Sequence, residues 1–463
     1  KVMNDISIIN TQVVLPDQII YGNVNIKDGK IMSINQGDSF IKDAETIIDG
    51  KDMYLLPGMI DSHVHIKGGK FSYREDFQSG TAAAAAGGVT TIFEMPVNNP
   101  PSSTEENFLR KQKEVDDYSY VDYCLYGGAG IDNLYEIPKI AKAGAIGFKT
   151  FLMPPVRNRE VEFFGLCSET KQDLIEVMKV ISETRLPIAV HSELNEYIQG
   201  IEQSLKEQGK DGLYAFCQSR PEVAEIEGVK RVISCSIQTG CKVLICHVST
   251  VKGIELIKAS QGRGFRIFGE TCPQYLLFSN EFASKSGVFG RIKPAYRDQS
   301  NVDMLMEMYR NGDFDATGSD HCPYLYEEKV KNGGSIWESV DGIPGIELSL
   351  PLLLNQVVKQ KIGMIELANS LSTRTAKLFG IDKNKGSIEV GKDADLVLVK
   401  KLDKPKKIKL DSLFTKSKNT AHLYEDIPLH FEIKKTFVRG KEIFSDGSIV
   451  GTPGYGQWIK PTI

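Results

Sequence analysis

The chain has 463 residues, of which 41% are hydrophobic and 25% are charged, and its formal net charge is −4. This length exceeds one average domain and suits a large barrel with a smaller accessory domain. The nearly balanced charge gives no reason to expect nucleic acid or a membrane surface as a partner. We find neither a signal peptide nor a run of about 18 apolar residues, so we expect a cytoplasmic protein without a membrane span.

Both ends of the chain contain short β-branched runs that are separated by turn residues. The predicted strands cover residues 6–14, 19–26, 30–34, 395–399 and 434–438. Such runs, bounded by Asp-Gly and similar turns, are typical of strands. We therefore predict one small β-sandwich-like accessory domain, formed by residues 1–54 together with 385–463.

Between these ends, residues 55–384 alternate short apolar strands with longer helical stretches, which is the pattern of βα units. Eight strands can be placed, at residues 56–66, 89–95, 120–126, 145–152, 187–191, 242–248, 266–271 and 315–320. A helix over 81–86 ends at Gly87, a common residue at helix ends. The pattern favours an α/β fold, a (β/α)8 barrel of the TIM type. An open doubly wound sheet is the alternative, but no Gly-x-Gly-x-x-Gly turn follows the first strand.

Several other features give no sign of chemistry. The eight cysteines form no CxxC pair and are expected to be buried free thiols. Residues 400–418 hold eight lysines, which we interpret as a solvated loop of the accessory domain. Residues 194–240 have a helical pattern and are expected to pack away from the site. His422 and His430 lie in the accessory region and are given no role.

Five of the seven histidines stand at the ends of predicted strands. His63 and His65 are two apart on the first strand, so both side chains point to the same side. The fifth, sixth and eighth strands end at His191, at His247 and at Asp320 followed by His321. A lone histidine there is usually structural. Five at the mouth of one barrel indicate a metal site, because barrel active sites lie at the carboxyl ends of the strands.

Lys149 lies inside the apolar strand Gly-Phe-Lys-Thr-Phe-Leu. A buried lysine is unfavourable unless it is paired or its charge reaches a rim. The sequence alone leaves open whether this lysine forms an ion pair, reaches solvent or serves the predicted metal site. Glu193, two residues after His191, is either a carboxylate that supports a metal ligand or a surface glutamate.

A series of motifs runs through nearly the whole chain in a fixed order. They are Leu-Pro-Gly-Met-Ile-Asp-Ser-His-Val-His, the 82–91 stretch, Gly-Phe-Lys149, His191-Ser-Glu, Cys-His247-Val-Ser, Glu270-Thr-Cys-Pro-Gln-Tyr, Gly-Ser-Asp320-His and Gly391-Lys-Asp-Ala-Asp-Leu-Val. In content and order, this series resembles the cyclic amidohydrolases, the family of allantoinase, dihydroorotase, hydantoinase and dihydropyrimidinase.

The resemblance implies two divalent metal ions, held by His63, His65, Lys149, His191, His247 and Asp320. In that family the lysine is carboxylated by CO2, becoming N6-carboxylysine, and bridges both ions. Zn²⁺ is expected, and Mn²⁺, Co²⁺ or Fe²⁺ suit the same donors. Two ions about 3.5–4 Å apart can activate a bridging water and polarise an amide carbonyl. Asp320 would take the proton of that water and pass it to the leaving nitrogen.

The segments expected to contact the substrate resemble more than one enzyme of the family. The asparagine spacing of Met-Pro-Val-Asn98 is closest to allantoinase, whereas Tyr324 after the last strand is hydantoinase-like. Dihydroorotases carry arginine where this chain has Lys67, and hydantoinases carry tyrosine where it has Pro154. We expect allantoin as the substrate, converted to allantoate, with a dihydroorotase-like enzyme second and a hydantoinase or dihydropyrimidinase third.

The residues predicted to face this small cyclic amide or ureide are Lys67, Asn98, Lys293 and Arg297, and the two lysines favour an anionic or strongly polar ring. Two alternatives of another kind are a non-catalytic interaction protein and a mononuclear deaminase. Some dihydropyrimidinase relatives are non-catalytic interaction proteins that have lost metal ligands, but all six ligand positions are filled here. A mononuclear deaminase would not need Lys149. The resemblance also implies a homodimer or homotetramer.

Overall fold

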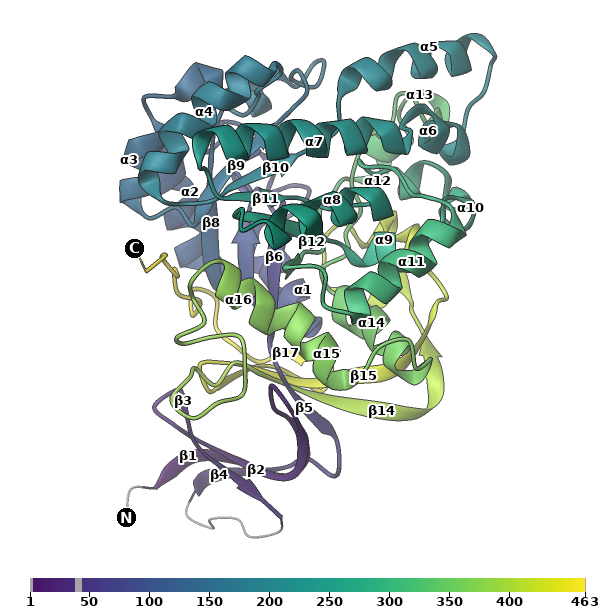
Figure 1. Cartoon of the computed structure of the whole chain (residues 1–463). Coiled ribbons are helices and arrows are strands. Elements are labelled where there is room, and N and C mark those ends of the chain that lie inside the picture. Colours follow the sequence, from purple (N-terminus) through teal and green to yellow (C-terminus); the bar gives the residue numbers. More distant parts are fainter. Residues whose placement is uncertain (1–2, 38–43, 463) are drawn as a thin grey trace.

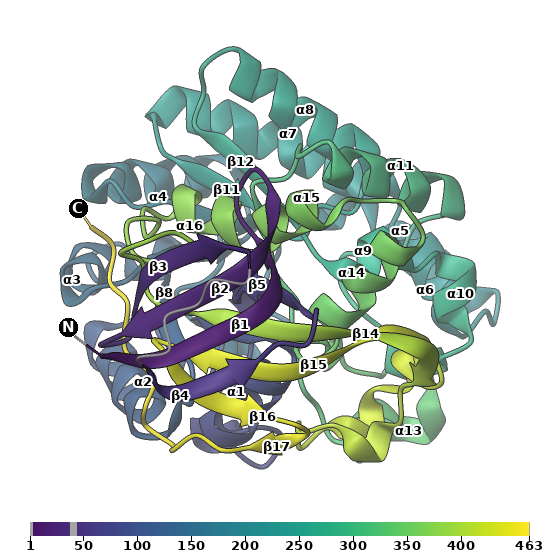
Figure 2. The ribbon, with the colours of Figure 1, turned by 90° about the horizontal axis from the view of Figure 1, so that it is seen from below.

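The computed structural model describes residues 3–37 and 44–462, so the predicted accessory ranges extend slightly beyond the described residues at 1–2, 38–43 and 463. Its strands form two sheets, an eight-stranded parallel sheet and a nine-stranded sheet (Figure 1). The nine-stranded sheet lies below the barrel in Figure 1 and faces the viewer in Figure 2. Within the described part of the chain, no helix is long and apolar enough to cross a membrane.

The parallel sheet takes its strands in chain order. They are β6 (Met59–Val64), β7 (Val89–Glu94), β8 (Asp122–Gly128), β9 (Gly147–Phe151), β10 (Ile188–His191), β11 (Val243–Ile245), β12 (Ile267–Thr271) and β13 (Ala316–Thr317). A parallel bridge between Val64 and His321 brings the end of the series back to β6. The sheet therefore closes, which confirms the predicted barrel and excludes the open doubly wound sheet.

Helices surround the barrel, as Figure 1 shows. The main ones are α1 (Phe77–Ala86), α2 (Glu105–Tyr118), α3 (Ile137–Ala143), α4 (Lys171–Thr184), α7 (Glu222–Thr239), α8 (Val251–Gly262), α11 (Gln299–Arg310) and α14 (Ser349–Val358). Local sequence sets their starts. The Asp76 side chain accepts a hydrogen bond from the Ser79 amide at 2.7 Å, and Thr104, Thr170 and Thr250 cap their helices in the same way. The predicted end of α1 at Gly87 is confirmed.

The second sheet combines strands from both ends of the chain, in the order β17-β16-β15-β14-β5-β1-β2-β3 with β4 beside β1. Its strands are β1 (Asn4–Val14), β2 (Ile19–Lys27), β3 (Lys30–Gln36), β4 (Ala44–Asp49), β5 (Tyr54–Pro57), β14 (Leu396–Lys407), β15 (Pro428–Val438), β16 (Lys441–Ser445) and β17 (Ser448–Ile449). The interpretation of 400–418 as a loop is wrong for its first part, because β14 continues to Lys407 along β15.

The predicted strand over 56–66 is in fact two strands in two sheets. β5 pairs with β1 and β14, whereas β6 pairs with β7 in the barrel. Gly58 stands between them, and a Cβ at this glycine would lie 2.1 Å from Thr90 Oγ1. The residues on both sides of Gly58 are apolar and buried, so hydrophobicity alone did not reveal that the chain changes sheet there.

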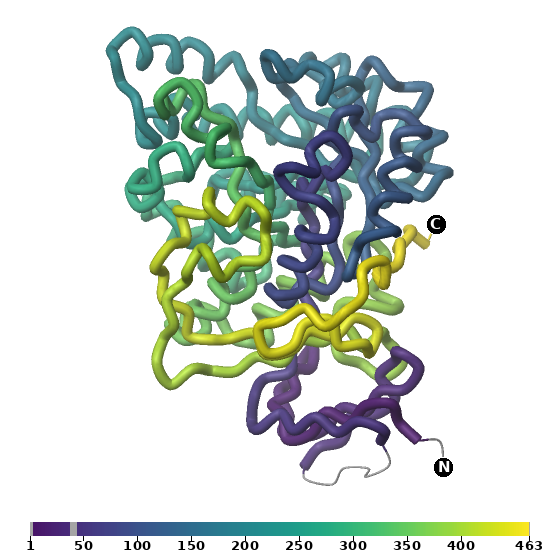
Figure 3. Tube along the Cα trace, turned by 180° about the vertical axis from the view of Figure 1, so that it is seen from behind, coloured from purple at the N-terminus to yellow at the C-terminus, as the bar shows by residue number. Residues whose placement is uncertain are grey.

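The last residues leave the accessory sheet and return to the barrel. Trp458 forms a parallel bridge with Tyr123, and the Gln457 amide donates to Asp122 at 2.8 Å. Figure 3 shows this yellow segment running from the sheet to the blue barrel region. The C-terminal end therefore contacts β8 of the barrel, and the division at 54/55 and 384/385 remains a prediction.

Candidate metal centre and active site

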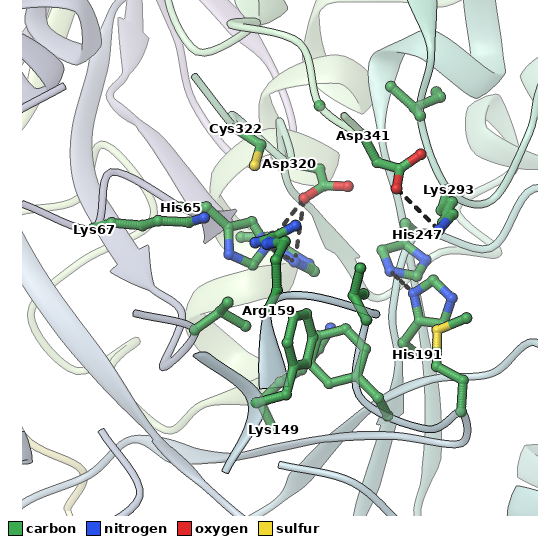
Figure 4. A pocket seen from close by; sticks show the side chains of 18 of the residues that line it. His65, Lys67, Lys149, Arg159, His191, His247, Lys293, Asp320, Cys322 and Asp341 are labelled. Carbon is green, nitrogen blue, oxygen red and sulfur yellow. Dashed lines mark hydrogen bonds and ion pairs between the residues drawn. The ribbon is translucent and has the colours of Figure 1, made fainter. Parts of the chain in front are cut away.

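The six predicted metal ligands meet in one cavity at the carboxyl ends of the barrel strands (Figure 4). His63 lies in β6 with His65 just after it, Lys149 lies in β9, and the others follow or end β10, β11 and β13: His191, His247 and Asp320. On the far side, apolar side chains such as Ile60, Phe93 and Leu244 fill the barrel interior. The candidate ligands therefore lie at the end where barrel enzymes carry their sites.

His63, His65 and Asp320 form the first group of candidate ligands. The two histidine Nε2 atoms are 3.2 Å apart, and they lie 3.4 and 3.3 Å from Asp320 Oδ1. Zinc–nitrogen bonds of about 2.0–2.1 Å in a tetrahedron separate ligand atoms by about 3.3–3.4 Å. The three atoms therefore have the spacing of tetrahedral ligands. His63 Nδ1 donates to Glu270 Oε1 at 2.8 Å, which leaves its Nε2 free to bind a metal.

His191 and His247 form the second group, with 3.1 Å between His191 Nδ1 and His247 Nε2. His191 Nε2 donates to Glu193 at 2.9 Å, so the lone pair of this imidazole is on Nδ1, facing His247. Glu193 also accepts hydrogen bonds from Arg220 at 2.7 and 3.1 Å. Burial would raise the pKa of Glu193, but the charge of Arg220 and the His191 hydrogen bond hold it below its usual range.

Glu193 and Arg220 settle two questions left by the sequence. Glu193 is fully buried and contacts a candidate ligand, so it is not a surface glutamate. As expected, no residue of 194–240 lines the cavity, but Arg220 supports the site indirectly through Glu193. This arginine precedes α7 in an Arg-Pro-Glu sequence that looks like an ordinary helix start, and only the fold brings it to Glu193.

Lys149 is fully buried, and its Nζ donates to Cys246 Sγ at 3.2 Å. The same nitrogen lies 5.0 Å from the centre of the Phe151 ring. Among the described residues, no carboxylate lies within ion-pairing distance of it. Lys149 therefore neither reaches solvent nor forms an ion pair, and it faces the cavity between the two groups of histidines.

The electrostatic surroundings suit metal binding, because a histidine ligand must be neutral. Burial lowers the pKa of His65 to about 3, and it also lowers the pKa of His191 and His247. Burial acts in the same direction on His63, but the charge of Glu270 outweighs it and raises the pKa to about 10. Three imidazoles are thus neutral at pH 7, and metal binding at His63 would displace a proton.

The structure separates the four predicted substrate contacts into two pairs. Lys67 and Lys293 line the cavity. Asn98 and Arg297 are not among its lining residues. Asn98 Nδ2 donates to the backbone oxygen of Lys67 at 2.6 Å, and Arg297 Nη1 donates to the backbone oxygen of Arg220 at 2.6 Å. In this arrangement, both side chains hold neighbouring segments of the site.

Sequence reasoning missed further lining residues, which come mainly from the loops after β9 and β13. They include Met153, Val156, Arg159, Phe163, Cys322 and Asp341. Tyr324, noted in the sequence only as a family resemblance, also lines the cavity. These residues share no repeat or spacing. Their only signal was their position in loops at the carboxyl end of barrel strands, where binding residues concentrate.

The family model for the amidohydrolase family matches residues 54–443. The chain belongs to the amidohydrolase family. Among members of this family, the L-hydantoinase of Paenarthrobacter aurescens is 32% identical over 99% of this chain and 98% of its own length. An allantoinase of Bacillus licheniformis is 33% identical over 94% of this chain and 95% of its own length.

Solved structures of amidohydrolases agree with this assignment. L-Hydantoinase (dihydropyrimidinase) from Arthrobacter aurescens superposes with a TM-score of 0.92 at 32% identity, covering 99% of this chain and all of that one. D-Hydantoinase (dihydropyrimidinase) from Thermus sp. superposes with a TM-score of 0.87 at 26% identity, covering 98% of this chain and 99% of that one. The family and barrel predicted from the motifs are confirmed.

Proposed function

We propose that this amidohydrolase hydrolyses the C–N bond of a cyclic amide with the help of two divalent metal ions. The observation that carries the proposal is the pair of ligand groups, one of three atoms and one of two, on either side of Lys149. A mononuclear deaminase would leave the buried Lys149 without a role. A non-catalytic relative would have no reason to keep every ligand position filled.

Carboxylation of Lys149 by CO2 would complete both groups. His191 and His247 supply only two donors, and a carboxylate on Lys149 would add a third to them and a fourth to the first group. The carboxylate would also replace an unpaired buried ammonium by a negative group next to the metal cations. The buried charge would then have partners, which makes its burial less unfavourable. Imidazole and carboxylate donors suit Zn²⁺, and Mn²⁺, Co²⁺ or Fe²⁺ are compatible.

The metal ions would activate water and polarise the amide carbonyl. The chain itself supplies the proton path. Asp320 lies at the mouth of the barrel with its side chain 16% exposed. Ionised Asp320 can accept the proton of the attacking water and return it to the leaving ring nitrogen. Glu270 and Glu193 keep the imidazoles of His63 and His191 in the orientation that metal binding requires.

For the natural ring, allantoin hydrolysed to allantoate is our first candidate, supported by the allantoinase relatives and the Asn98 segment. A dihydroorotase-like activity is the second candidate, because Lys67 and Lys293 line the cavity and would attract an anionic ring. Hydantoinase or dihydropyrimidinase activity is the third, supported by the L-hydantoinase relative. We retain the expectation of a cytoplasmic homodimer or homotetramer as part of the proposal.

Metal analysis followed by a substrate panel tests the proposed function. About two ions per chain and turnover of allantoin, dihydroorotate or a 5-substituted hydantoin are expected. Hydrolysis rates measured at matched concentrations of the three rings rank the candidates. Protein that stays inert towards all of them after reconstitution with Zn²⁺ or Mn²⁺ and bicarbonate would favour the non-catalytic alternative.

A further inference from the structure

Two cationic side chains, Lys67 and Arg159, line the same region of the cavity (Figure 4). Lys67 follows the His63 and His65 pair, and Arg159 belongs to the loop after β9. Both reach one carboxylate, since Glu162 lies 2.7 Å from Arg159 Nη2 and 3.6 Å from Lys67 Nζ. The two cations are therefore neighbours across a single shared counter-ion.

The two cations Lys67 and Arg159 share a single carboxylate, so positive charge is in excess here. Glu162 receives two hydrogen bonds from Arg159, through Nε at 2.8 Å and Nη2 at 2.7 Å, which leaves Nη1 unused. Lys67 is only 2% exposed, yet its Nζ has no hydrogen-bond partner in the described part of the protein. A buried ammonium without a hydrogen-bond partner is unfavourable unless something else supplies one.

Among the residues that the structure describes, no second carboxylate pairs with either cation. Arg74 lies close by, but its own charge is positive and its partner is Glu328, at 2.9 Å from Nε. Across the cavity in Figure 4, Lys293 has a direct partner in Asp341 at 2.9 Å. The free donors are therefore on the side of Lys67 and Arg159. Phe163 and Tyr324 border them, and such apolar walls strengthen attraction for an anion.

We propose that Arg159, together with Lys67, binds a carboxylate on the ring substituent of the substrate and makes the site selective for acidic rings. The inference rests on the proposed cyclic-amide hydrolysis and names the class of ring. The free Nη1 of Arg159 and the ammonium of Lys67 provide charge-assisted donors for the two carboxylate oxygens. This anion site revises the order of candidates taken from the relatives, because it moves carboxyalkyl hydantoins and dihydroorotate above allantoin, whose ureido group is uncharged.

Matched pairs of rings test the inference on the metal-loaded enzyme. Hydantoins with a carboxymethyl or carboxyethyl group at C5 are compared with their carboxamides, which have nearly the same shape and no charge. We expect kcat/KM to be about 10- to 100-fold higher for each acid, the range of one charge-assisted interaction. Arg159→Gln removes this preference by slowing hydrolysis of the acids alone. Arg159→Lys retains part of it.

Arg157→Gln is the control, because Arg157 is exposed on the same loop and does not line the cavity. It leaves the preference unchanged. Equal kcat/KM for acid and amide in the unmodified enzyme, or an equal loss for both in Arg159→Gln, overturns the inference.

A binding measurement separates this inference from the proposed function. Calorimetry with the ring-opened products, N-carbamoylglutamate and N-carbamoylglutamine, reports the side-chain preference without turnover. Tighter binding of the acid, abolished in Arg159→Gln, supports the anion site even if no ring is hydrolysed, in which case the proposed function alone fails. Equal binding of the two products overturns the inference even if rings are hydrolysed. Thermal midpoints of the variants confirm that each remains folded.

Discussion

Glu193 accepts a hydrogen bond from His191 at 2.9 Å and thereby directs the other imidazole nitrogen towards His247. Arg220 keeps the carboxylate ionised by donating two hydrogen bonds to it. Glu193→Gln keeps the shape of the side chain but removes its charge. We expect metal affinity to fall about 10- to 100-fold, as is typical when a partner of a metal ligand is lost. Competition with a chelator measures this change.

Glu196→Gln is the matched control for that experiment. Glu196 lies three residues later, its side chain is 61% exposed, and its partner is Arg231 rather than a candidate ligand. Its substitution should leave metal affinity unchanged. If both variants bind metal as tightly as the unmodified protein, Glu193 does not position His191.

Lys149→Met tests the proposed carboxylation. Methionine fills a similar volume without an amine, so CO2 has no site of addition and the second group keeps only two donors. We expect metal content to fall from about two ions to at most one per chain, and bicarbonate to lose its effect on loading. Elemental analysis with and without bicarbonate gives both values.

Lys142→Met replaces an exposed lysine of the preceding segment and serves as the control. It should load two ions and respond to bicarbonate. Two ions bound to Lys149→Met would contradict a bridging role for Lys149.

Lys385 joins the accessory sheet to the barrel through buried ion pairs. Its Nζ lies 2.7 Å from Asp122 at the start of β8 and 2.7 Å from Asp395 before β14. Removing one partner of a buried pair leaves the other charge uncompensated, which costs about 3–5 kcal/mol. Lys385→Met should therefore lower the thermal midpoint strongly, whereas Lys383→Met, at an exposed position nearby, should not. Equal midpoints for the two variants would show that the ion pairs contribute little.

The sequence predicted the parts of the site that local patterns determine. His63 and His65 share a strand face by their spacing, and the ends of apolar strands located His191 and His247. Lys149 stood out because a charge is rare within a buried strand. These features depend on a few neighbouring residues, so they can be recognised before the fold is known.

Long-range contacts were not visible in this way. Glu193 and Arg220 are 27 residues apart, and nothing in either segment indicates that they meet. The hydrophobic run around Gly58 did not show that the chain changes sheet, since both sheets bury it. The loop that carries Arg159 has no regular pattern, so its contribution to the cavity depends on tertiary structure.

Lys329 provides a test of stability against pH that is independent of metal binding. It is fully buried, and its Nζ donates to the backbone oxygen of Val340 at 3.0 Å. Burial lowers its pKa from 10.5 to about 7, so the folded protein gives up this proton more readily than the unfolded chain. Between about pH 7 and 10.5 the unfolded state binds more protons at this site, and its contribution to the free energy of unfolding therefore rises with pH. Below pH 7 the full penalty of a buried charge applies.

Lys329→Met should remove this dependence. We expect the variant to gain stability relative to the unmodified protein at pH 6, with the gain shrinking as the pH rises towards 10. Denaturant midpoints at several pH values between 6 and 10 measure the difference, and Lys331→Met, at an exposed position two residues later, should show none of it. A difference between Lys329→Met and the unmodified protein that stays constant across this range would mean that Lys329 keeps its proton in the folded state.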